Sequence, residues 1–399
     1  MARVARAGAR SLPRTLRATR YAAAAAWNYL TLELAMEKNN QRRRRRRLPL
    51  FKRMPELLDA QHGATFAGPV FTDDLLVRQA DGTERAVRRR FRSLTSRDIE
   101  ILGLLLEFRH LERDHVVALL RGDRPRSKSD GAGRQIDGRL SGLFHHGLVQ
   151  RYPRAARMRP DLPENRTPAA PIYGLDTEGW KHLAYARQRG WWRGGEDELT
   201  KWRKDHTRRG ATFVLHTLMR SHFRVVLTLG VRGADVEIDA WDESVGGRIR
   251  VMLDPASGTA EDLPVFPDAY FALEGPRGRR NLFLEVDRET ERMDRIRKKL
   301  LGYWFYFAEE RGEHAYVRTY PNPERVNVLF VVKTPERLGN MLDLMERLQK
   351  PSNPRFGGRG VFWFCLEEDY NLANPASILG PIWRSVTRPG ERLSLLEGM

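Results

Sequence analysis

Two apolar stretches of the sequence carry carboxylates at positions where a buried strand would need apolar side chains. Asp268 follows Pro267 within residues 265–273, and Glu285, 17 positions later, is followed by Asp287 within residues 281–287. Carboxylates that converge from neighbouring strands are costly to bury unless they bind a divalent cation or meet a Lys or Arg. Their oxygens suit Mg²⁺ or Mn²⁺, which can activate water and neutralise charge on a scissile phosphate. The spacing therefore predicts a metal site made of Asp268, Glu285 and Asp287.

Lys299 is the candidate cation of this site. Side chains alternate along a strand, so Glu285 and Asp287 share one face. In the helix that follows, apolar residues at positions 293, 296, 300, 303 and 307 define the inward side, and Lys299 belongs to it. An inward lysine needs an anion, so Lys299 is predicted to orient water or to stabilise the transition state. The alternative is a solvated strand end whose acids only favour the start of the helix.

Bringing these residues together requires a sheet in which the two acidic stretches are neighbours. The pattern of residues 205–385 predicts, besides the acidic strands, helices at 205–222, 289–310 and 335–348 and strands at 225–229, 236–241, 325–332 and 361–366. Strands that come first and then alternate with helices are typical of a mixed sheet flanked by helices. The fold class is therefore α/β for this domain, and α+β for the whole chain.

Residues 94–190 predict a winged helix-turn-helix. Helices are expected after Leu94, at 111–120 and from Arg134 to a stop at Gly147, followed by a ribbon of strands 148–152 and 172–175 and a helix at 177–189. Such a module places its third helix in the major groove and its ribbon on the DNA backbone or in the minor groove. The residues predicted to contact DNA are Arg134, Gln135 and Arg139 on the third helix, and Arg154, Arg157 and Arg159 at the ribbon tip. A module used only for protein contacts is the alternative.

Positive charge is concentrated at the N-terminus. The net charge is +19, and residues 1–56 alone hold 15 Lys and Arg against three acids. This favours a polyanionic partner, of which nucleic acid is the commonest, and predicts an arm that stays flexible until it meets phosphates. A weakly ordered tail after an upstream start is an equal alternative for the arm. The remaining parts are a connecting segment at 57–93, a linker at 191–204 whose tryptophans either pack between domains or stack on bases, and a tail at 386–399.

The single cysteine and the hydropathy pattern define the expected compartment. Cys365 has apolar neighbours and no cysteine partner, which excludes an internal disulfide and a Cys-based zinc site and indicates a reducing environment. The Ala-rich stretch 21–30 is too short to span a bilayer. We therefore expect a soluble cytoplasmic protein without a membrane partner. The sequence gives no oligomeric state.

From about Leu94 to Trp383 the chain resembles the replication-relaxation family of bacterial plasmid and mobile-element proteins. The residues that carry the resemblance are Leu94 to Asp98, Arg139-Leu140 with Leu143-Phe144 before Gly147-Leu148-Val149, Tyr173-Gly174-Leu175, Pro267-Asp268, Glu285 to Glu291, Lys299-Leu300 with Tyr303, and the strand Val328 to Val332. Their order and spacing together are fairly specific. The family implies a winged helix followed by a domain similar to the PD-(D/E)xK nuclease fold, acting where DNA is relaxed or opened at replication or transfer origins.

The resemblance also implies roles for single residues. Asp268 and Glu285 match the metal ligands of the PD-(D/E)xK pattern, whereas Asp287 stands where that pattern has its catalytic lysine. Lys299 with Tyr303 resembles the Gln-x-x-x-Tyr helix motif of RecB-like nucleases, in which case the lysine comes from a neighbouring element. His216 matches a position often occupied by histidine in the first helix of the nuclease-like domain. It either approaches the acids or is a buried core histidine.

Three functions follow as hypotheses. The first is a Mg²⁺- or Mn²⁺-dependent endodeoxyribonuclease of a plasmid or mobile element. The second is a non-catalytic origin-binding accessory or transcriptional regulator that has a degenerate nuclease fold and needs no cofactor. The third is a protein-interaction adaptor whose charge is incidental. Double-stranded DNA is the expected partner of the first two, with other replication or transfer proteins as further partners.

Overall fold

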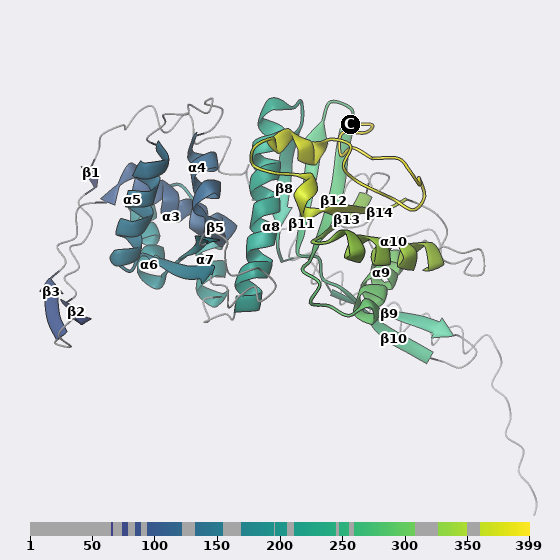
Figure 1. Ribbon diagram of the computed structural model, residues 1–399, viewed down its shortest axis with the longest axis horizontal. Coiled ribbons are helices and arrows are strands. Elements are labelled where there is room, and N and C mark those ends of the chain that lie inside the picture. The colour runs from purple at the N-terminus through teal and green to yellow at the C-terminus, as the bar shows by residue number, and fades with distance from the viewer. Residues whose placement is uncertain are drawn as a thin grey trace, which may run out of the picture. The chain divides into compact units, whose positions relative to one another are not determined.

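A computed structural model describes residues 65–66, 74–78, 84–88, 94–121, 132–154, 169–194, 196–205, 211–244, 247–254, 259–307, 326–348 and 360–399. These residues form eight α-helices, a three-stranded antiparallel sheet, a five-stranded mixed sheet and three strand pairs (Figure 1). The predicted mixed α/β class is confirmed. The described residues divide into two compact units, of which the smaller contains the hairpin β9–β10 and the last turns of α9.

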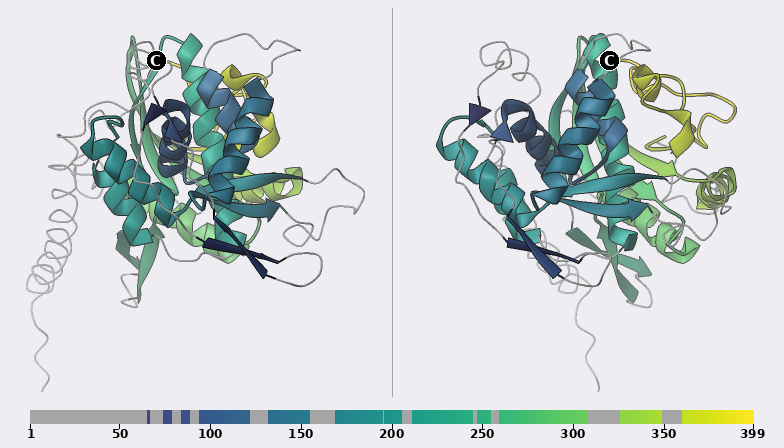
Figure 2. Two further views of the ribbon diagram at one scale, coloured as in Figure 1. Left: turned by 90° about the vertical axis from the view of Figure 1, so that its left-hand side faces the viewer. Right: turned by 60° about the vertical axis from the view of Figure 1, so that its left-hand side comes forward.

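The first part of the larger unit, residues 94–205, is called the helical lobe below. Its elements are α3 (Ser96–Phe108), β5 (His110–Glu112), α4 (Arg113–Arg121), α5 (Ala132–His145), β6 (Val149–Arg154), β7 (Ala169–Leu175), α6 (Thr177–Gln188) and α7 (Glu196–Asp205). Its antiparallel sheet has the order β5-β7-β6, and Figure 2 shows the β6–β7 pair beside the helices. The second predicted helix thus starts later than expected, because His110 to Glu112 pair with β7 as a strand.

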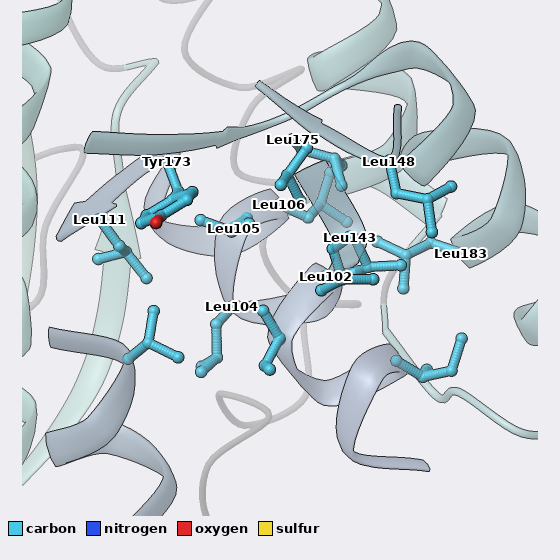
Figure 3. Close-up of a cluster of buried hydrophobic side chains, with 14 of the residues drawn as sticks. Leu102, Leu104, Leu105, Leu106, Leu111, Leu143, Leu148, Tyr173, Leu175 and Leu183 are labelled. Carbon is cyan, nitrogen blue, oxygen red and sulfur yellow. The ribbon is translucent and has the colours of Figure 1, made fainter. Parts of the chain in front are cut away.

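Capping and apolar burial together define this lobe. The Thr95 side chain accepts from the backbone N–H of Asp98, and Asp98 accepts from the Thr95 N–H, which satisfies donors at the start of α3. Behind this cap, leucines of α3 meet leucines of α5, β7 and α6 in one cluster, as Figure 3 shows. Trp192 and Trp202, from the stretch predicted as a linker, belong to the same core, and Trp202 stacks on Trp180 with centroids 6.1 Å apart. These two tryptophans are therefore packed inside the lobe.

The rest of the larger unit is called the sheet lobe. Its elements are α8 (Ala211–Gly230), β8 (Glu237–Asp242), β11 (Ala269–Gly275), β12 (Gly278–Asp287), α9 (Met293–Phe307) as far as Leu300, β13 (Val326–Val332), α10 (Pro335–Leu348) and β14 (Phe362–Leu366). The sheet order is β14-β13-β12-β11-β8. Strands β12, β13 and β14 are parallel and are connected through α9 and α10, whereas β11 is antiparallel to both of its neighbours.

Helix α8 corrects one prediction. Residues 225–229, predicted as a strand, continue α8 to Gly230. Val225 packs into the core of the helical lobe, while Val226 and Leu227 pack into the core of the sheet lobe. A helix buried on two sides shows an uninterrupted apolar run, which cannot be told from a buried strand by periodicity.

The two faces of the five-stranded sheet have different neighbours. One face, with Leu284 and Val286 of β12, packs against α8 and against residues near the C-terminus. Residues 386–399, indicated as a tail by the sequence, contribute the buried Leu393 and Leu395 to this core. The other face carries Glu285 and Asp287, which contact side chains of α9 and α10.

The strand pairs were not predicted. They are β1 (Thr65–Phe66) with β4 (Leu94–Thr95), β2 (Asp74–Arg78) with β3 (Glu84–Arg88), and β9 (Gly247–Asp254) with β10 (Thr259–Val265). The basic arm at 1–56 lies outside the described residues. Within the described part of the chain, none of the helices combines the length and apolarity needed to cross a membrane.

Candidate functional site

Asp268 and Glu285 meet at one end of the β11–β12 pair. Ala269 lies opposite Leu284 in this antiparallel pair, so Asp268, one residue earlier, lies opposite Glu285. The Asp268 N–H donates to the Leu284 carbonyl at 2.8 Å, and the Val286 N–H donates to Asp268 Oδ2 at 2.7 Å. Glu285 is 2% exposed. The sheet thus places side by side the two acids that match the PD-(D/E)xK pattern.

Lys299 reaches this pair from the second turn of α9 and forms ion pairs with two acids. Its Nζ lies 2.9 Å from Glu285 Oε2 and 3.1 Å from Glu291 Oε2. Burial opposes the charge of the lysine, but Glu285, Glu291 and Asp268 outweigh burial and raise the pKa of Lys299 well above its ordinary value. The ammonium therefore stays charged at every physiological pH. Its position against Glu285 is the one that the helical spacing indicates.

His216 approaches the same acids from α8. Its Nε2 lies 2.7 Å from Asp268 Oδ1, and its side chain is 34% exposed. Burial favours the neutral form of Asp268, yet the hydrogen bond and charge of His216, the Val286 N–H and Lys299 together lower the pKa of Asp268. Of the two readings of His216, the structure agrees with the one in which it contacts the acids.

Asp287 takes part in a separate, buried pair. Arg337 of α10 donates through Nε to Asp287 Oδ2 at 2.6 Å and through Nη2 to the Glu291 carbonyl at 2.6 Å. Asp287 Oδ1 accepts from the N–H of Glu289, where the backbone turns with φ 65°. With both oxygens engaged, Asp287 fixes the turn between β12 and α9. The structure does not join it to Asp268 and Glu285.

The donor set fits a hard cation with two protein ligands. Among the described residues, no group of three or more His, Cys, Asp and Glu side chains is arranged to hold a metal ion. Mg²⁺ is commonly bound by one or two carboxylates, with waters and substrate phosphates completing the shell. Asp268 and Glu285, adjacent and largely buried, provide such a pair. The three-carboxylate site of the sequence analysis stays a prediction.

Tyr303, the secondary candidate one turn beyond Lys299, is fully buried. Its ring stacks on that of Phe307, with centroids 6.3 Å apart. It therefore serves the packing of α9. Lys299 and Tyr303 have the spacing of the Gln-x-x-x-Tyr motif. Lys299 takes the glutamine position, and it is the one of the two that lies nearer the acids.

The predicted DNA-contacting residues divide into three groups. Arg134 and Gln135 are exposed on the first turn of α5, and α5 ends at Gly147, which has φ 70°. Arg139 instead donates through Nη1 to Thr95 Oγ1 at 2.7 Å and to Asp98 Oδ1 at 3.0 Å, so it fastens α5 to the cap of α3. Arg154 is described only in its backbone, which pairs with Ala169, and Arg157 and Arg159 lie outside the described residues.

Two residues of the site were not assigned from the sequence. Glu291 shares Lys299 with Glu285, and its only sequence signal is its place in the acidic stretch that follows β12. Arg337 lies 50 residues from Asp287, and nothing in the local pattern of α10 distinguishes it from other helical arginines. Contacts that span such separations are set by topology.

A comparison with known families agrees with this arrangement. Residues 102–319, more than half of the chain, match the replication-relaxation family. The chain belongs to the replication-relaxation family. The resemblance stated from the sequence is thereby confirmed, and membership implies a role related to plasmid replication. The comparisons with curated proteins and with solved structures found no match.

Proposed function

We propose that this replication-relaxation protein binds duplex DNA through the helical lobe and cleaves a phosphodiester bond at the Asp268–Glu285 site. The order of helical-lobe elements, α3, β5, α4, α5, β6 and β7, is that of a winged helix. Arg134 and Gln135 stand exposed at the start of α5, the helix that such modules place in the major groove. Arginine and glutamine side chains can form paired hydrogen bonds with guanine and adenine.

One observation carries the proposal of cleavage. Asp268, the residue that precedes β11, lies beside Glu285 of the neighbouring strand β12, and Lys299 Nζ is 2.9 Å from Glu285. This is the residue set of a PD-(D/E)xK site, with the lysine supplied by α9 in place of the strand position that Asp287 occupies. Mg²⁺ or Mn²⁺ held by the two carboxylates would supply activation of water. Lys299, permanently charged, is placed to stabilise negative charge that develops on the phosphate.

Cleavage is tested on supercoiled plasmid that carries the origin of the same element. With Mg²⁺ or Mn²⁺ the wild-type protein should nick or linearise the plasmid. Asp268→Asn, Glu285→Gln and Lys299→Met should each lower the rate by about 100-fold or more, as does the loss of one group that stabilises transition-state charge. Asp294→Asn is the matched control, because this exposed α9 carboxylate lies outside the site. Unchanged plasmid with both metals between pH 6 and pH 9 would sink the nuclease proposal.

A non-catalytic origin-binding or regulatory protein is the second candidate, and a specific observation favours it. Each of the three carboxylates already has a basic partner within the protein: Asp268 has His216, Glu285 has Lys299, and Asp287 has Arg337. A site paired in this way can keep its fold without a metal. This candidate predicts duplex binding that is insensitive to EDTA, is weakened by Arg134→Ala, and is accompanied by no rise in the melting temperature on addition of Mn²⁺.

A further inference from the structure

An exposed aromatic ring stands one helical turn from the acid site. Phe213 is 40% exposed and lies in the first turn of α8, three residues before His216. Residues three apart in a helix share a side and are separated by about 4.5 Å along the axis. Because His216 contacts Asp268 at 2.7 Å, the ring of Phe213 is a near neighbour of the site.

Phe213 is also the last member of a series of three neighbouring aromatic rings, and the other two belong to the helical lobe. The ring of Tyr152, on β6, lies 5.4 Å from that of His110, and His110 lies 6.3 Å from Phe213 with the planes at 80°. His110 is buried, so it supports Phe213 from inside the protein. Strand β6 belongs to the β6–β7 ribbon, which the sequence predicts to contact DNA. The ring series thus leads from the ribbon to the Asp268 site.

A cation and the positive end of a helix dipole lie close to Phe213. Arg288, the first residue after β12, donates through Nη1 to the carbonyl of Thr212 at 3.1 Å, which holds its guanidinium beside the residue that precedes Phe213. The first turn of α8 contains no acidic residue, so the positive end of the helix dipole is not offset there. A flat apolar ring bordered by a fixed cation suits a ligand that alternates aromatic groups with anionic groups.

We infer that Phe213 and Arg288 form a subsite for an unpaired strand of nucleic acid, in which the Phe213 ring stacks on a base and Arg288 binds the adjacent phosphate. In a closed duplex the base faces are covered by neighbouring base pairs, so an aromatic ring gains a stacking partner only from an unpaired or extruded base. The inference rests on the proposed function and narrows it: the sheet lobe takes DNA that is already opened, while α5 takes the closed duplex.

The test is DNA binding by the full-length protein in EDTA, which separates it from any cleavage. One sequence is presented as a single strand, as a closed duplex and as a duplex with an internal unpaired bubble. Phe213→Leu, which keeps an apolar group against His110, should weaken binding of the single strand and the bubble by about 5- to 100-fold, the range for loss of one stacked base. Closed duplex should bind unchanged, and Phe213→Tyr should restore wild-type affinity for all three.

Two further variants complete the design. Arg288→Gln should lower the slope of log affinity against log salt for the single strand by about 0.7, as expected for one phosphate contact. Leu396→Ala is the matched control, because Leu396 is an apolar side chain of similar exposure, 37%, outside the subsite. In the wild type, a strand containing 5-iodouracil should photocrosslink to the peptide that includes Phe213.

The outcomes separate this inference from the proposed function. Equal losses on all three DNAs, no loss on any of them, or failure of Phe213→Tyr to restore binding would each overturn the stacking subsite. If Arg134→Ala leaves duplex binding intact and plasmid is never cleaved, the proposed function fails, while selective loss of single-strand binding in Phe213→Leu still establishes the subsite.

Discussion

The two halves of α8 hold their polar and aromatic groups in opposite ways. In the second half, Arg224 is 13% exposed and donates to the carbonyl of Glu107 at 2.8 Å and to its Oε1 at 2.6 Å. Its guanidinium also lies 4.7 Å from the centroid of the Phe108 ring and 4.8 Å from that of Trp241. In the first half, by contrast, Phe213 and His216 are 40% and 34% exposed.

This difference indicates which contacts serve the fold and which are available to a ligand. Ser221 and His222 also face the helical lobe, through the Phe108 carbonyl and through His115, whose Nε2 lies 2.9 Å from His222 Nδ1. The second half of α8 is thus fastened to α3 and α4. Because a helix is stiff over a few turns, these contacts also set the position of His216. We therefore expect substitution of Arg224 to cost stability and substitution of the exposed Phe213 or His216 to cost activity.

The largest expected effect is that of Arg224→Ala. It removes two hydrogen bonds and two ring contacts and leaves Glu107 buried without its cation, so the free energy of unfolding should fall by about 3–5 kcal/mol. Burial already raises the pKa of Glu107 against the opposing effect of Arg224, and the variant should raise it further. A carboxyl with a raised pKa stabilises the fold at low pH and loses this contribution as pH rises, so the deficit should be smaller at pH 5 than at pH 8.

Urea unfolding at both pH values measures this effect. Lys181→Ala is the matched control, because the Lys181–Glu178 pair lies on the surface of α6 with both side chains more than a third exposed. Its loss should change the free energy of unfolding by less than about 0.5 kcal/mol. A similar cost for the two variants would contradict the assignment of the second half of α8 to the fold.

Most elements could be predicted from periodicity, and the exceptions have physical causes. The limits of α10 agree with the sequence pattern, and β13 begins one residue later than expected, because each has one apolar face or a short apolar run with clear ends. The second half of α8 was taken for a strand because both of its sides are buried. The hairpin β9–β10 was missed because polar and apolar residues alternate in it only over residues 248–251, and the sequence of β10 shows no regular alternation.

The sequence predicted which residues form the candidate site more fully than it predicted the partners that they contact. Acids in strand-like runs and an inward lysine indicated Asp268, Glu285 and Lys299, and the sheet register brings them together. Strand alternation puts Asp287 on the same face as Glu285, but it cannot show that Asp287 pairs with Arg337 of α10. Helical spacing likewise cannot reveal that Arg139 bonds to the cap of α3, since the partner is 41 residues away.

A second prediction concerns pH and the contact between the helical lobe and α8. Burial, with the charges of Arg220 and Arg109, lowers the pKa of His110 from 6.5 to about 4. Below pH 6.5 the unfolded chain binds a proton that folded His110 does not, so stability falls as pH decreases from 6.5 to 4. The full loss is about 3 kcal/mol. His110→Gln should flatten the curve of unfolding free energy against pH in this window, whereas the exposed His145→Gln should leave it unchanged; a curve unaltered by His110→Gln would contradict the buried role of this histidine.

Among the substitutions that test the contrast within α8, His216→Ala is expected to have the smallest effect on stability, and it gives the sharpest test. The side chain is one third exposed, and Asp268 keeps the Val286 N–H and the charge of Lys299, so the free energy of unfolding should fall by only about 1 kcal/mol. Metal-dependent cleavage should nevertheless drop by about 10- to 100-fold, the usual consequence of removing a group that orients a ligating carboxylate. His216→Gln, whose amide N–H can still donate to Asp268, should recover most of this loss. A stability cost as large as that of Arg224→Ala, without any recovery by Gln, would place His216 with the residues that hold the fold, and the two halves of α8 would no longer differ in kind.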